Sequence, residues 1–344
     1  MRTWRPDYRR WQGQAAGVWA RRLSITRYGL KLCLAGKAIR FFILIAFLQG
    51  FVLSVLFGAF GQIINPESAL SNWIAGIAGE RNAAILNGLT AWALVYPEIC
   101  IDGVYRAAFY LTKFSASPLS LIITALFIHR LIALDLASQA IVIYNSKALT
   151  RWDYLIGKFL IAVCILSFIW IVPVVAAWLI GNTLSPDIRF FLYTFPSLAR
   201  SVLVGIVAAL TFSIFALAIS SLAKRAGSAV AYWILGWVSL GIFSGIAKAT
   251  YPILQFINPF SAINEFSAGV FRMNSFFQRA REELPVFNGY LENFIKRNID
   301  DGKTLSSVVD EIPATDGSLI APTLFLVIIC LASAAIANRR IALS

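Results

Sequence analysis

The long apolar runs constrain the fold of this 344-residue chain more than any other feature. Crossing the roughly 30 Å hydrocarbon core of a bilayer takes about 20 mostly apolar helical residues. Six segments approach that length, at about 41–61, 116–134, 155–180, 198–222, 228–247 and 319–338. Because unpaired backbone groups are costly in lipid, such runs must be helices. The sequence therefore predicts an all-α integral membrane protein with about six transmembrane helices.

Composition narrows the function classes. Hydrophobic residues make up 59% of the chain and charged residues 14%, with a mean hydropathy of +0.74, which excludes an ordinary soluble domain. The net charge of +13 comes from bases near the ends of apolar runs, which is typical of membrane proteins, so we expect no nucleic-acid partner.

Residues for common catalytic and metal sites are scarce. The four cysteines form no CxxC pair, and His129 is the single histidine. The usual zinc sites, Cys/His pairs and Ser/His/Asp triads are therefore not expected, and we predict no catalytic residue, no metal site and no enzyme activity.

The distribution of bases predicts the orientation. Residues 1–40 contain ten Lys or Arg and one acid, Asp7. The apolar run 83–96 is only about 14 residues long, so we expect an interfacial or re-entrant segment there. With six spans, the bases at 147–158, 224–225 and 339–340 lie on the same side as the N-terminus. The positive-inside rule then places both termini in the cytoplasm.

Residues 1–40 are expected to form an amphipathic elbow region on the inner membrane face. Arg21, Arg22, Arg27 and Lys31 alternate there with aromatic and aliphatic side chains. Two roles stay open for this region: electrostatic anchoring to anionic lipid, or anchoring together with contact to a cytoplasmic partner.

The segment 251–318 carries nine of the seventeen acids and lies on the other side of the membrane. Pro252 and Pro259 interrupt its apolar part, 251–270, which favours a short re-entrant hairpin. The polar remainder, 271–318, is expected to form a small outer cap. We interpret its acids as a solvated surface rather than a glycosidase or calcium site.

Any ATP-driven work must be done by another chain. Gly302, Lys303 and Thr304 spell the end of a P-loop, but Arg297 stands where the motif needs its first glycine. The spans contain almost no ionisable residue away from their ends, which argues against coupling to protons or sodium. In the fifth span, Gly241 and Gly245 form a GxxxG pair that favours either packing within the chain or a dimer seam.

One polar stretch, Leu134 to Lys158, interrupts the apolar runs and carries a recognisable pattern. Its residues are Asp135, Ala140, Tyr144, Ser146, Leu149, Arg151, Asp153, Tyr154, Gly157 and Lys158. The stretch resembles the link between the second and third spans of ABC-2 type permeases, the membrane subunits of ABC exporters. It departs from that pattern at Gln139, where a small residue is usual, and at Lys147 and Ala148, which replace Arg and Pro.

The resemblance implies a type V exporter fold. Two permease chains, identical or paralogous, would pair, and each would dock on one of two cytoplasmic ATP-binding cassette subunits that bind ATP and Mg. This chain itself would hold no cofactor. The link would form a coupling helix at about 135–148. The residues implied in coupling are Asp135, Ile141, Ile143, Tyr144, Asn145, Ser146, Lys147, Arg151 and Tyr154.

We expect four regions: the elbow region at 1–40, helices one to five at 41–250, the outer segment at 251–318, and the sixth helix with a cytoplasmic tail at 319–344. The expected function is export of a hydrophobic or amphipathic substrate across the inner membrane of a prokaryote. The alternatives are an ATP-independent transporter, a lipid-modifying enzyme, or an ABC-coupled subunit that does mechanical or assembly work.

Overall fold

The computed structural model describes residues 17–65, 67–73, 76, 90–91, 93, 95–140, 150–185, 187–283, 316 and 319–342. Across these residues the secondary structure is helical and contains no strand. Six helical segments are long and apolar enough to cross a membrane: Lys37–Ile64, Ile99–Ala137, Arg151–Thr183, Arg189–Leu222, Ala226–Thr250 and Ile320–Ile341. The predicted all-α membrane fold with six spans is confirmed.

Several spans are built from more than one helix. The first span is α2 (Lys37–Ile64), and the second comprises α4 (Pro97–Leu111), α5 (Lys113–Phe127), the 3-10 turn η1 (Ile128–Arg130) and α6 (Ala133–Ala137). The third comprises α8 (Arg151–Trp170) and α9 (Val172–Thr183). The last three are α10 (Arg189–Leu222), α11 (Ala226–Thr250) and α16 (Ile320–Ala342).

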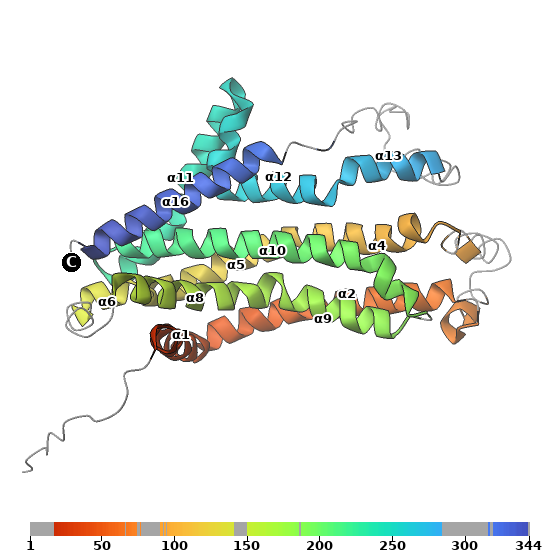
Figure 1. Cartoon of the computed structure of the whole chain (residues 1–344), viewed down its shortest axis with the longest axis horizontal. Coiled ribbons are helices and arrows are strands. Elements are labelled where there is room, and N and C mark those ends of the chain that lie inside the picture. The colour runs from red at the N-terminus through yellow and green to blue at the C-terminus, as the bar shows by residue number, and fades with distance from the viewer. Residues whose placement is uncertain are drawn as a thin grey trace, which may run out of the picture.

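Helix α10 forms the centre of the bundle, where it packs against α4, α8 and α16 (Figure 1). In the most apolar 18-residue stretch of α10, 61% of the residues are buried, whereas in the corresponding stretch of α11 only 17% are buried. Figure 1 shows that α6, the start of α8 and the ends of α10 and α16 lie at one end of the bundle. We call this the basic end, because it carries Arg130, Arg151, Lys224, Arg225, Arg339 and Arg340.

Helices α2 and α9 lie very close together because small residues face bulky ones. A Cβ built at Gly50 would lie 2.9 Å from the Pro173 ring, and one built at Gly181 would lie 2.4 Å from Phe57 Cβ. Neither position has room for a larger side chain. Close backbone approach at small residues is a common way of packing helices in membranes.

The third span breaks at Ile171, between α8 and α9. Pro173 stands in the first turn of α9, where its missing N–H is tolerated, and the residues just before a proline are pushed away from helical geometry. The two halves have different neighbours: α8 packs mainly against α1 (Val18–Leu34) and α10, and α9 packs mainly against α2.

The second span is longer than the sequence indicates. It begins near Ile99 instead of Ala116 and contains a break at Thr112, less than two turns before Pro118. Asp102, Arg106 and Lys113 therefore lie in the first half of this 39-residue segment, and their depth in a membrane stays a prediction, as does the expected lack of ionisable residues away from the span ends. The apolar run in the sequence begins only at Ala116, because charged side chains interrupt the apolar pattern before it.

The amphipathic N-terminal helix is present as α1. Figure 1 views α1 nearly end-on while the spans run across the picture, so α1 lies roughly perpendicular to them. Its exposed side chains include Trp19, Leu23 and Tyr28, which suits a helix lying in a membrane interface. Trp11 and the rest of 1–16 lie outside the described residues.

After α11 the chain forms the 3-10 helix η2 (Pro252–Ile257), α12 (Pro259–Phe271) and α13 (Met273–Glu283). Asn258 caps α12 by accepting a 3.0 Å hydrogen bond from the Phe260 N–H, and Arg272, with φ 47°, separates α12 from α13. Helix α12 packs against α10 and α16. Its place beside two spans fits a re-entrant segment, and its depth in a membrane stays a prediction.

Gly241 and Gly245 face open space. Among the described residues, no heavy atom lies within 4 Å of a Cβ built at either glycine. The described residues therefore show no packing of this glycine pair against another helix of the same chain. The dimer seam stays a prediction.

The remaining predictions in two regions fall largely outside the described residues. These comprise most of 83–96, the Gly302-Lys303-Thr304 sequence, and every acid of 292–311.

Candidate functional site

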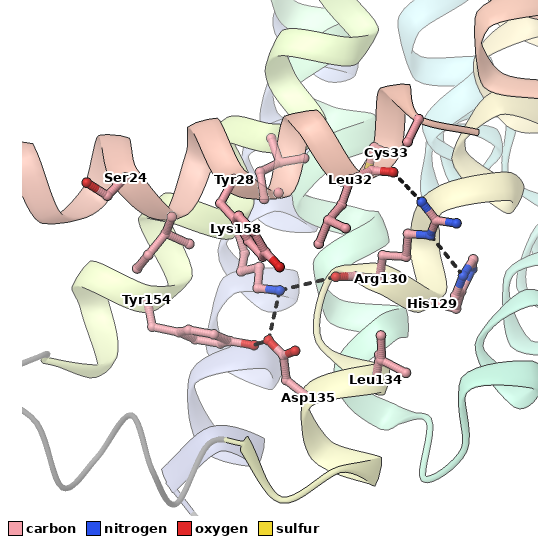
Figure 2. Close-up of a pocket in the computed structure, with 14 residues that line it drawn as sticks. Ser24, Tyr28, Leu32, Cys33, His129, Arg130, Leu134, Asp135, Tyr154 and Lys158 are labelled. Carbon is pink, nitrogen blue, oxygen red and sulfur yellow. Dashed lines mark hydrogen bonds and ion pairs between the residues drawn. The ribbon is translucent and has the colours of Figure 1, made fainter. Parts of the chain in front are cut away.

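Three side chains of the polar link meet at the basic end (Figure 2). The Asp135 Oδ2 atom of α6 lies 2.8 Å from the Lys158 Nζ of α8 and accepts a 2.6 Å hydrogen bond from the Tyr154 hydroxyl. Lys158 also donates to the Arg130 carbonyl at 3.1 Å. Because the two charged side chains are only 12% and 14% exposed, this ion pair is screened weakly by solvent. It fixes the start of the link to α8.

A second ion pair ties α8 to α1. Arg22 Nε lies 2.7 Å from Asp153 Oδ1, and the Asp153 side chain is 2% exposed. Asp153 also forms a capping box with Thr150 at the start of α8: the Asp153 N–H donates to Thr150 Oγ1 at 3.2 Å. One carboxylate thus begins α8 and holds it against the amphipathic helix.

The start of the link is also anchored on the central helix. The buried Ser220 hydroxyl of α10 accepts hydrogen bonds from the Ile132 and Ala133 N–H groups, both at 3.0 Å, and donates to the Ile128 carbonyl at 2.8 Å. These are backbone groups freed where η1 gives way to α6. Together, contacts among α1, α6, α8 and α10 hold the helices that precede and follow residues 141–149 in the sequence.

The structure brings together two of the predicted coupling residues, Asp135 and Tyr154. Arg151 is exposed in the first turn of α8, apart from this ion pair. The other predicted coupling residues lie outside the described residues: Ile141, Ile143, Tyr144, Asn145, Ser146 and Lys147. The sequence placed Arg22 in the amphipathic region and Asp153 in the family pattern, but it did not predict that the two side chains pair. The Thr150-x-x-Asp153 spacing was the available signal, because it is a capping-box pattern before an apolar run.

The predicted coupling helix does not run unbroken from Asp135. Helix α6 ends at Ala137, and Gln139 adopts a left-handed backbone conformation with φ 55°. Glycine is favoured there because a Cβ costs energy. The departure of Gln139 from the small residue of the family pattern therefore places a strained residue at the turn.

Gln139→Gly should stabilise the protein by about 0.5–1 kcal/mol. Glycine removes the strain of the left-handed conformation, and the greater backbone entropy of glycine in the unfolded chain offsets part of that gain. The midpoint of thermal unfolding in detergent would measure it. Ser138→Gly is the matched control, because Ser138 has φ −91° and should gain nothing. Equal shifts in the two variants would contradict strain at Gln139.

A second polar cluster lies between α4 and α10, toward the opposite end. Asp102 is 5% exposed and accepts a hydrogen bond from the Ser197 hydroxyl. Its Oδ2 lies 2.7 Å from Arg106 Nη2 and 3.6 Å from Arg200 Nη1. The Arg106 guanidinium also lies 4.7 Å from the centre of the Phe276 ring, which joins α13 to α4. One buried carboxylate therefore balances two cations.

Comparison with protein families decides the classification. A family model described as "ABC-2 family transporter protein" matches residues 104–340, more than half of the chain. The chain belongs to the ABC-2 transporter family. The resemblance carried by residues 134–158 is thus confirmed. Comparison with curated proteins finds no match.

As an ABC-2 permease, the chain is a multi-pass membrane component of an ABC transporter, and its family membership implies association with an ATP-binding cassette subunit. The match begins within α4 and ends within α16. It includes the residues of both polar clusters of the ABC-2 permease, except for Arg22 and Asp102, which precede its first residue. Helices α1 and α2 precede it.

Proposed function

We propose that this ABC-2 permease exports a hydrophobic or amphipathic substrate, with ATP hydrolysed and Mg held by a separate cytoplasmic subunit. The observation that carries the proposal is the polar link: Asp135 at its start contacts Tyr154 and Lys158 at its end, and Ser220 holds the backbone just before its start. The basic end faces the cytoplasm of a prokaryote in this proposal, because bases gather there.

The link would transmit movement of the ATPase to the spans. Residues 141–149 connect α6 to α8 in the sequence, and the short Asp135–Lys158 contact joins these helices directly. A push on the segment therefore acts on the second and third spans together. Such coupling requires that the ATPase contact the link differently in its two nucleotide states.

The buried Asp102 does not favour proton coupling. It accepts a 2.7 Å hydrogen bond from Arg106 and lies 3.6 Å from Arg200, so structural ion pairing with two arginines accounts for this carboxylate. An energy source in a partner chain accounts better for the arrangement. The proposed complex has two ATPase subunits and two permease chains, with the open face of α11 at Gly241 and Gly245 available for the second permease.

Tyr144→Ala tests the docking role. We expect the variant to insert normally but to lose most of the transport, with a fall of at least about tenfold in substrate-stimulated ATP hydrolysis, since aromatic anchors dominate many interfaces. The measurement uses the permease and its ATPase subunit, purified together and reconstituted in liposomes.

Tyr251→Ala is the matched control, because Tyr251 is an exposed tyrosine at the far end of α11 and should leave transport unchanged. If Tyr144→Ala transports at the wild-type rate, the link is not the docking surface. If the purified chain moves or modifies a lipid without any ATPase, the exporter proposal itself fails.

A further inference from the structure

A cavity of about 690 Å³ opens between α1 and the junction of η1, α6 and α8 (Figure 2). Its volume falls within the roughly 300–1,000 Å³ range of ligand pockets. It lies at the basic end, next to the helix that we place in the membrane interface. None of the roles assigned above fills it.

Most of the cavity wall is apolar. Ile25 and Leu32 contribute from α1, Leu134 from α6 and Ile161 from α8. Gly29 lets α1 approach α8 closely, since a Cβ built there would lie 2.1 Å from Ile161 Cδ1. Burial in these surroundings raises the pKa of the Cys33 thiol, which also lines the wall, so that it stays neutral. Such a wall accommodates hydrocarbon and does not suit a free ion.

The polar part of the cavity is cationic. Arg130 and Lys158 line it together with Asp135, which leaves one excess positive charge when His129 is neutral. Arg130 uses Nε to donate to His129 Nε2 at 3.3 Å and Nη1 to donate to the Leu32 carbonyl. Among the described residues, its Nη2 group makes no hydrogen bond, and Lys158 makes one hydrogen bond, to the Arg130 carbonyl, and one ion pair, with Asp135. Donors for an anion are therefore available beside an apolar wall.

We propose that this cavity binds one anionic phospholipid of the inner leaflet. The phosphate accepts hydrogen bonds from Arg130 and Lys158, and an acyl chain lies along Ile25, Leu32 and Ile161. A phospholipid combines the two chemistries of the cavity, and basic residues attract anionic lipid at the cytoplasmic surface. The exposed Trp19 and Tyr28 place α1 at the depth of the headgroups.

The inference goes beyond the proposed function, because it concerns lipid binding to the permease and requires no ATPase. The bound lipid would join α1 to the residues that hold the polar link. Since its test reads lipid binding directly, a failure would leave the docking proposal standing, and a failure of docking would leave the lipid site standing.

The experiment measures binding of phosphatidylglycerol to the full purified chain in detergent by native mass spectrometry. Arg130→Gln should weaken binding about tenfold, the loss of one charge-assisted hydrogen bond. Arg27→Gln is the matched control, because Arg27 is an exposed arginine on α1 that does not line the cavity. Ser24→Trp, at an exposed lining position, should block the cavity and lower binding without removing a charge.

Equal loss in Arg27→Gln and Arg130→Gln would overturn the site in favour of general surface attraction. Unchanged binding in Ser24→Trp would overturn it as well, and this variant remains informative if Arg130→Gln does not fold. Phosphatidylcholine should bind more weakly than phosphatidylglycerol. Inorganic phosphate should not displace the lipid at millimolar concentration, and displacement by it would show an anion site instead of a lipid site.

Discussion

Asp102→Ala is expected to destabilise the protein by about 3–5 kcal/mol, the usual cost of removing one partner from a buried ion pair. The substitution leaves Arg106 and Arg200 near each other without their shared carboxylate. Ser197 loses its acceptor in the same step. Thermal unfolding in detergent, followed by circular dichroism, measures the effect.

Asp187→Ala provides the matched control. Asp187 also lies near an arginine, Arg189, but at 3.8 Å and with both side chains exposed. Exposed pairs contribute about 0–1 kcal/mol, and the exposed hydrogen bond that Asp187 Oδ1 accepts from the Arg189 N–H at 2.9 Å contributes about 0.5–1.5 kcal/mol, so this variant should destabilise the protein much less than Asp102→Ala does. If Asp102→Ala unfolds at the same temperature as Asp187→Ala, then Asp102 does not neutralise the two arginines.

Reversing one charge at the polar link should abolish coupled transport. Asp135→Lys puts a cation in the place of the carboxylate that faces Lys158, and two like charges about 4 Å apart repel by about 4 kcal/mol at an effective dielectric constant of 20. Helices α6 and α8 would separate at the basic end. We expect substrate-stimulated ATP hydrolysis by the reconstituted complex to fall by at least about tenfold.

The double variant Asp135→Lys, Lys158→Asp restores opposite charges and should recover a large part of the activity. Tyr154→Phe removes a single hydrogen bond to Asp135 and should cost about 0.5–1.5 kcal/mol of stability with little loss of coupling. Full activity in Asp135→Lys, or no recovery in the double variant, would show that this ion pair does not connect the link to the third span.

The apolar runs were sufficient to predict the class of fold. Length and hydropathy identified the six spans because membrane helices must satisfy their own backbone groups. The start of the second span was missed, since Asp102, Arg106 and Lys113 interrupt the apolar pattern, and Asp102 pairs both with Arg106 in its own helix and with Arg200 from a distant one. A sequence window contains no information about Arg200 facing Asp102 across the bundle.

The candidate site was predictable where its residues are close in sequence. Asp135 and Tyr154 belong to the polar stretch, and the structure joins them. The pairing of Arg22 with Asp153 spans 131 positions and depends on how α1 crosses α8. The left-handed turn at Gln139 could not be predicted either, because glutamine is not a residue type that favours a positive φ.

The break at Ile171 gives the third span a pivot. Below it, α8 is bound to the amphipathic helix and the polar link, and beyond it α9 is locked to α2 at Gly50 and Gly181. We expect the two halves to tilt independently, with the bend confined to a few residues before Pro173. If the proposed ATPase contact moves the basic end, α8 would tilt while the packing of α9 on α2 stays unchanged, so the two ends of the third span need not move at the same time.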